Sequence, residues 1–217
     1  VTTLTGYSVA KNLMNPLMHS DNIYFAQTAL RIGKDSFIEN LDRIGFNEQL
    51  DFPLTLEKST YGEITSDGEL ADSGFGQGEI EVNPIHMASI YSGFANGGNM
   101  IRPFIEYGKE TEILKEGAFS QEAAETIKND LIQVVENEQG SANDMKISGL
   151  TIAGKTGTAE LKVSKDDTES GTLGWFDCFT IDRTDGEDYL IVSMVENVQN
   201  NSDRGSHYLI RKIRSLF

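Results

Sequence analysis

Three strand-like segments follow one another in the last third of the chain, and this feature constrains the fold more than any other. They cover residues 151–161, 172–181 and 189–195. Consecutive strands joined by short connections usually pair as an antiparallel meander. An apolar stripe in residues 206–217 predicts a C-terminal helix that packs on this sheet.

The rest of the chain is predicted to be mainly helical. Asn83-Pro84 is typical of a helix start, because asparagine is a preferred N-cap and proline is tolerated in the first turn. Further helices are predicted over residues 12–19, 23–32 and 36–44, and after Ser120. Residues 46–82 show no clear period and are predicted to be irregular. We therefore expect one α/β domain: an antiparallel sheet flanked by helices (residues 151–217) plus a helical subdomain (residues 12–150).

Composition excludes several classes of function. The formal net charge is −16, which argues against binding a phosphate backbone. One cysteine and three histidines that lie far apart in the sequence give no spacing for a zinc site, so no metal is expected. No run of about eighteen apolar residues predicts a membrane span, and no leader is visible, so we expect this chain to be soluble.

Two short motifs carry groups suited to acyl transfer: Ser20-Asp21-Asn22 before a helix, and Lys155-Thr156-Gly157-Thr158 on a strand. Acyl transfer needs a proton path and donors for the developing oxyanion. The hydroxyl of Ser20 beside the ammonium of Lys155 can relay a proton, and the amide of Asn22 can hold a peptide carbonyl. The alternative reading is structural, with Ser20 and Asn22 as helix caps and Lys155 as a surface lysine.

The strand motif also offers a place for a substrate. Gly157 leaves an open strand edge where a substrate backbone can lie close, and Thr158 offers an N–H and a hydroxyl. We predict Thr156, Gly157, Thr158 and Trp175 as substrate-binding residues, with catalytic roles for the three residues named above. Trp175 has an alternative role as part of the core, and Cys178 is predicted to be buried and inert.

The wider sequence resembles the class B penicillin-binding proteins, most closely the low-affinity type that confers β-lactam resistance in Gram-positive cocci and rods. Ser-Asp-Asn and Lys-Thr-Gly are two of the three signature motifs of serine β-lactamases and penicillin-binding proteins. The matching stretches are Ser20–Gly33, Ala71–Met87, Gly154–Lys162 and Gly174-Trp175-Phe176.

The resemblance implies a penicillin-binding, serine β-lactamase-like fold and a D,D-transpeptidase. Such an enzyme cross-links peptidoglycan stem peptides ending in D-alanyl-D-alanine and is acylated by β-lactam antibiotics, without a cofactor. By position, Ser20 is the proton relay, Asn22 the amide anchor, and Lys155 the partner of Ser20. Thr158 binds the substrate carboxylate and donates one oxyanion N–H. The resemblance also implies a membrane-anchored parent at the extracellular face of the cell membrane, within a cell-wall synthesis complex.

One family motif is not found at its family position, the Ser-x-x-Lys that supplies the nucleophile. It lies several dozen residues before Ser-x-Asn in the family, whereas Ser20 is only the twentieth residue here. Ser8-Val9-Ala10-Lys11 fits the pattern but lies too close to Ser20. We therefore predict an N-terminally truncated domain whose nucleophile precedes Val1, which forms no penicillin adduct by itself. An uncovered sheet edge in such a fragment predicts self-association.

Three other functions stay open. A β-lactam sensor domain shares the fold and the motifs, and gene context would separate it from a transpeptidase. A β-lactamase needs a deacylating base, and turnover of nitrocefin would reveal one. A structural lobe that only docks partners fits less well, because both motifs are retained.

Overall fold

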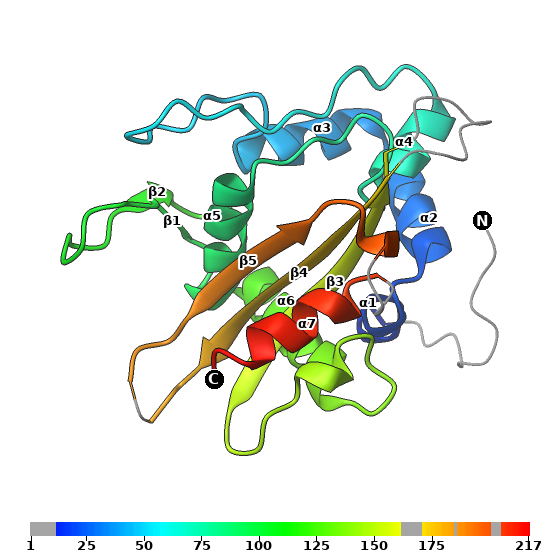
Figure 1. Cartoon of the computed structure of the whole chain (residues 1–217). Coiled ribbons are helices and arrows are strands. Elements are labelled where there is room, and N and C mark those ends of the chain that lie inside the picture. Colours follow the sequence, from blue (N-terminus) through cyan, green and yellow to red (C-terminus); the bar gives the residue numbers. More distant parts are fainter. Residues whose placement is uncertain (1–11, 162–170, 185, 201–204) are drawn as a thin grey trace. The chain divides into compact units, whose positions relative to one another are not determined.

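The computed structural model describes residues 12–161, 171–184, 186–200 and 205–217, without the side chain of Gln199. These residues form two compact units (Figure 1). One unit holds residues 21–127, and the other holds residues 12–20 together with the described residues from 128 onward. The boundary that the sequence predicts at residue 150 stays a prediction. Ser8 and Lys11 of the Ser-x-x-Lys pattern lie outside the described residues.

The first unit consists of helices and a short antiparallel hairpin. Its elements are α2 (Asn22–Ile32), α3 (Lys34–Arg43), α4 (Asp67–Ser73), α5 (Pro84–Ala95), β1 (Met100–Ile101), β2 (Ile113–Lys115) and the start of α6 (Gln121–Glu136), which continues into the second unit. Two clusters of buried apolar side chains form its core, one around Phe46, Ile90 and Met100 and one around Ala29, Ile64 and Leu70.

The predicted helix starts in this unit are confirmed by their caps. Asn83 accepts a hydrogen bond from the N–H of Ile85 at 2.8 Å, and Ser120 accepts one from Ala123 at 3.1 Å. Each cap satisfies a backbone donor that has no partner within its helix. Gly33 ends α2 with φ of +81°, a conformation that glycine adopts without a steric penalty.

The prediction that residues 46–82 are wholly irregular is wrong, because α4 lies within them. Ser66 and Glu69 form a reciprocal capping box at its start: Ser66 Oγ accepts from the N–H of Glu69, and the Glu69 carboxylate accepts from the N–H of Ser66. The Ser-x-x-Glu spacing of this box is present in the sequence, but the helix is only 7 residues long. The β1–β2 hairpin was also not predicted, since strands of 2 and 3 residues show no alternation.

The second unit is built on a three-stranded antiparallel sheet in the order β3-β4-β5. Its strands are β3 (Thr151–Glu160), β4 (Thr172–Ile181) and β5 (Leu190–Val195), close to the three predicted segments. The remaining elements are α1 (Met14–His19), the end of α6, the 3-10 turns η1 (Asn143–Met145) and η2 (Val198–Asn200), and α7 (His207–Arg214). The predicted meander and C-terminal helix are therefore confirmed.

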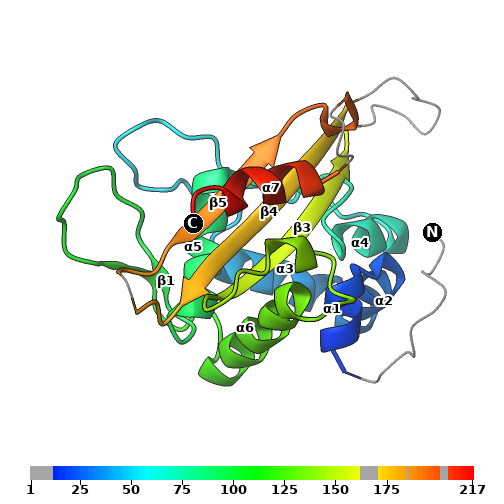
Figure 2. The same cartoon turned by 60° about the horizontal axis from the view of Figure 1, so that its bottom comes forward.

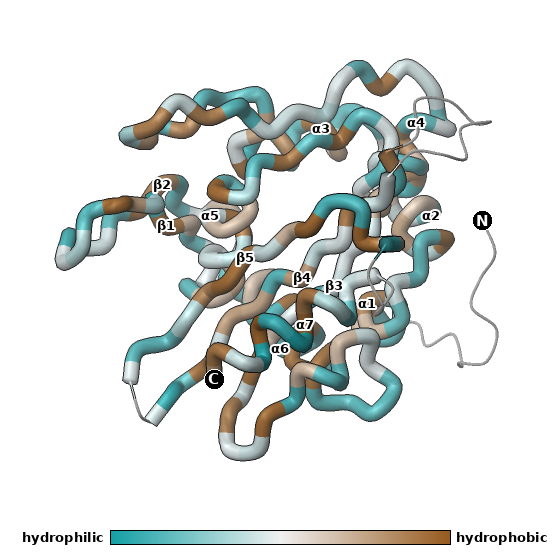
Figure 3. The backbone as a smooth tube through the Cα atoms, in the orientation of Figure 1, coloured by the Kyte–Doolittle hydropathy of each residue, from teal (hydrophilic) through white to brown (hydrophobic). Residues whose placement is uncertain are grey.

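Helices and sheet share one core in this unit. Phe176 and Ile152 of the sheet are fully buried together with Val134 of α6 and Ile210 of α7. α7 lies across the sheet in both views (Figures 1 and 2), as its apolar stripe predicts. Coloured by hydropathy, β5 is mostly brown (Figure 3), and its sequence LIVSMV contains no charged residue.

Candidate active site

The second unit brings Ser20 and Lys155 together, although 135 positions separate them in the sequence. Lys155 Nζ donates a hydrogen bond to Ser20 Oγ and a second one, of 2.8 Å, to the carbonyl oxygen of Thr156. The ammonium of Lys155 therefore lies between Ser20, which follows α1, and the backbone of β3, the strand that carries Lys155. This is the contact that the two motifs predict.

Ser20 has a backbone conformation that is uncommon for a residue with a side chain. It follows the last residue of α1 with φ of 52° and ψ of 51°, in the left-handed region. Non-glycine residues occupy this region at some energetic cost, which the surrounding structure must offset. The left-handed turn ends α1 and leaves the hydroxyl within reach of Lys155.

Burial alters the acid–base behaviour of Lys155. It lowers the pKa of Lys155 to about 8, because removal from water disfavours the charged ammonium. A group with such a pKa stays mostly protonated at neutral pH but can exchange its proton readily. Lys155 is thus suited to supply a proton through Ser20.

The predicted substrate-binding residues lie along β3 and β4. Gly157 pairs with Trp175 across the two strands, and a Cβ atom on Gly157 would lie 3.1 Å from the Cβ of Trp175. Trp175 is half-buried, whereas the next residue, Phe176, is fully buried in the core. Within the described part of the chain β3 pairs with β4 alone, so the strand that carries Thr156 and Thr158 has one free edge.

Asn22 is the predicted site residue that belongs to the first unit. It is the first residue of α2, next to the cap Asp21, and its side chain is exposed. Its proposed role as an amide anchor stays a prediction. Cys178 is buried as predicted. Burial, and to a smaller extent the nearby charge of Asp177, raises the pKa of its thiol to about 12.

Two residues beside the motifs were not found from the sequence. Ser141, in the connection after α6, places its hydroxyl 3.0 Å from Thr156 Oγ1. Asp177 lies directly opposite Lys155 in the β3–β4 register, is 4% exposed, and has its pKa raised to about 7 by burial. Ser141 belongs to no motif, and the position of Asp177 in a strand gave no sign that its carboxyl is buried.

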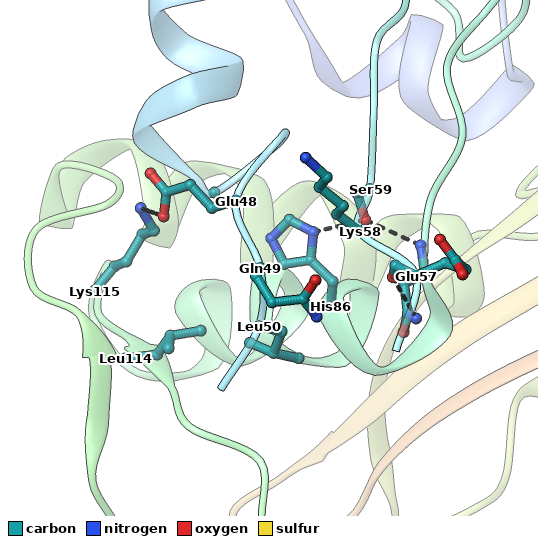
Figure 4. Close-up of a pocket in the computed structure, with 11 residues that line it drawn as sticks. Glu48, Gln49, Leu50, Glu57, Lys58, Ser59, His86, Leu114 and Lys115 are labelled. Carbon is teal, nitrogen blue, oxygen red and sulfur yellow. Dashed lines mark hydrogen bonds and ion pairs between the residues drawn. The ribbon is translucent and has the colours of Figure 1, made fainter. Parts of the chain in front are cut away.

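A recess in the first unit contains none of the predicted site residues (Figure 4). Its wall includes the buried His86, whose Nε2 lies 2.8 Å from the Ile44 carbonyl and whose Nδ1 lies 2.7 Å from Ser59 Oγ. Since a carbonyl can only accept, Nε2 carries the proton and Ser59 donates to Nδ1. Burial lowers the pKa of His86, which favours this neutral form. His86 therefore has a structural role, because it links α5 to Ile44 and to Ser59.

The family model of the penicillin binding protein transpeptidase domain matches residues 2–213. The chain belongs to this family. It is also 38% identical to penicillin-binding protein 3 of Bacillus subtilis (strain 168), over 98% of this chain and 33% of that protein. The chain thus spans about a third of the length of this curated relative.

Solved structures of penicillin-binding proteins share the fold. Penicillin-binding protein A from M. tuberculosis, as a ceftriaxone acyl-enzyme complex, superposes with a TM-score of 0.68 at 25% identity, over 81% of this chain and 41% of that one. Its imipenem acyl-enzyme complex gives a TM-score of 0.76 at 22% identity, over 97% and 48%. The predicted fold class is confirmed. Across the described ranges of this chain, no helix is long and apolar enough to cross a bilayer.

Proposed function

We propose that the chain is part of a peptidoglycan D,D-transpeptidase that forms an acyl-serine intermediate and is acylated by β-lactams. The substrate is a stem peptide ending in D-alanyl-D-alanine. The observation that carries this proposal is the hydrogen bond from Lys155 to Ser20, which joins the two motifs. Membership of the transpeptidase family and the names of the relatives support the same activity.

The reaction has two steps. In the first, the oxygen of a nucleophilic serine bonds to the carbonyl carbon of the penultimate D-alanine, and the peptide carbon–nitrogen bond breaks. The serine proton ends on the amine of the departing D-alanine. In the second step, an amine of another stem peptide attacks the acyl-serine, which forms a new peptide bond and restores the serine hydroxyl.

Ser20 and Lys155 serve the proton transfer in this scheme. Lys155 donates to Ser20 Oγ, so the hydroxyl proton of Ser20 is free to point toward the departing amine. Thr156 and Thr158 bind the substrate carboxylate, the N–H of Thr158 contributes to the oxyanion site, and Asn22 holds the substrate amide. Gly157 borders the substrate backbone at the edge of β3 that has no partner strand among the described residues, and Trp175 flanks Gly157 from β4.

Intact mass spectrometry after incubation with a penicillin tests the function. The full-length gene product should gain one drug-sized adduct that persists, whereas rapid loss of the adduct with turnover of nitrocefin would indicate a β-lactamase. No adduct on the full-length product would contradict the proposed activity. For the 217 residues alone we keep the prediction of no adduct. An adduct on the 217-residue chain would overturn this prediction, and peptide mapping would then show whether Ser8 is acylated.

The β5 edge supports a further proposal, self-association of this chain. Among the described residues β5 pairs with β4 alone, and it lacks the charges that usually protect an edge strand. We expect dimers at high concentration in light scattering, and monomers for Met194→Lys, which places a charge on the 39%-exposed Met194. Tyr107→Lys, on an exposed residue of the other unit, is the control and should still associate. A wild-type monomer at every concentration would contradict the proposal.

A further inference from the structure

Ser141 contacts both the segment that leads to Ser20 and the strand that carries Lys155. Its backbone N–H donates to the Met18 carbonyl at 3.1 Å, two residues before Ser20. Its hydroxyl lies 3.0 Å from Thr156 Oγ1, one residue after Lys155. A single residue outside the motifs therefore links the end of α1 to β3 beside the Ser20–Lys155 contact.

The position of Ser141 is fixed by its neighbours in the chain. The N–H of Ala142 donates to the Val134 carbonyl at 3.1 Å, which ties the connection to the end of α6. Asn143 adds a bond of 3.0 Å from its side-chain amide to the Val135 carbonyl. Gly140 lies so close to the Val134 carbonyl that a Cβ atom would collide with it. The hydroxyl of Ser141 is thus presented from a rigid support.

The direction of the hydrogen bond between Ser141 and Thr156 decides what Thr156 can do. Each hydroxyl has one proton to donate. If Ser141 donates, Thr156 Oγ1 accepts and its own proton is free for another acceptor. A substrate carboxylate accepts only, so a bound carboxylate favours this direction, in which Thr156 donates to it.

We propose that Ser141 is a positioning residue of the transpeptidase site, which donates to Thr156 Oγ1 and so directs the Thr156 hydroxyl toward the substrate carboxylate. This inference rests on the proposed function. Ser141 does not touch the substrate, and its effect is exerted through Thr156. Its bond to Met18 also steadies the residues that lead to Ser20.

The kinetic test measures acylation of the full-length gene product by a penicillin. Ser141→Ala should weaken the apparent binding of the drug roughly tenfold, the effect of losing about 1.4 kcal/mol, and leave the limiting acylation rate nearly unchanged. Ser141→Thr keeps the hydroxyl and should restore binding. Ser148→Ala, an exposed serine in the same connection, is the matched control and should behave as the wild type.

A double-mutant cycle separates positioning from a general structural effect. If Ser141 acts through Thr156, Ser141→Ala should add little to the loss already caused by Thr156→Val. Equal losses in both backgrounds, or a loss confined to the limiting rate, would overturn the inference.

A second measurement does not depend on acylation. In the 217-residue chain, NMR of the Thr156 methyl group should report one side-chain rotamer in the wild type and averaging in Ser141→Ala. An unchanged rotamer in the variant would overturn the inference. The full-length wild type could remain unacylated while Ser141→Ala still shows averaging of the Thr156 rotamer. In that case the proposed function fails, but the positioning of Thr156 by Ser141 stands.

Discussion

Replacing Lys155 by methionine is expected to slow acylation of the full-length gene product by a penicillin roughly 10²–10⁴-fold, the usual contribution of a positioned acid or base. Methionine keeps much of the length of the side chain but removes the ammonium that donates to Ser20 and to the Thr156 carbonyl. The rate of adduct formation, followed by mass spectrometry at several drug concentrations, measures the effect. Lys212→Met, on the exposed face of α7, is the control and should be acylated at the wild-type rate.

The pH dependence gives a sharper form of the same prediction. The protonated form of Lys155 makes the bond to Ser20, so the wild-type rate should fall as pH rises through the pKa of about 8. Lys155→Arg stays charged over this range and should lose that fall, even if the rate is lower throughout. A methionine variant with the wild-type rate, or an arginine variant with an unchanged alkaline fall, would show that Lys155 does not serve the proton transfer.

The stability of the sheet unit is expected to fall as pH rises from about 4 to about 7, because of Asp177. An aspartate in the unfolded chain titrates near 3.8, whereas burial raises the pKa of Asp177 in the fold to about 7. Between these values the folded state binds one more proton than the unfolded state, so each pH unit lowers the free energy of unfolding. The total loss is about 4 kcal/mol and levels off above the folded pKa.

Asp177→Asn should remove this loss and leave the variant more stable than the wild type by about 2–4 kcal/mol at pH 8. The amide oxygen can still accept the hydrogen bond that the N–H of Ser193 donates to Asp177 at 3.2 Å. Urea unfolding of the chain at a series of pH values measures the difference. Glu187→Gln is the control, because it removes an exposed negative charge from the same unit. It measures how much stability is gained simply by reducing charge repulsion in a chain of net charge −16. Parallel pH profiles for wild type and Asp177→Asn would refute the assignment.

Local sequence signals predicted most of the secondary structure. Asn83 and Ser120 cap the helices they were expected to cap, and Gly33 ends α2, because these effects depend on neighbouring residues alone. α4 was not predicted, because a single capping box around Ser66 is a weak signal for a short helix. The antiparallel meander followed from short connections between apolar strands.

The sequence by itself determined most of the elements, the family resemblance and the residues on which an acyl-transfer site would be built. Only the tertiary structure decided which of them meet. The sheet and α1 place Lys155 against Ser20 across 135 positions, and no local rule relates residues so far apart. The same packing buries Asp177 and brings Ser141 to Thr156. Burial and long-range hydrogen bonds arise when separate elements pack together, and they set the pKa of Lys155 on which the proposed chemistry depends.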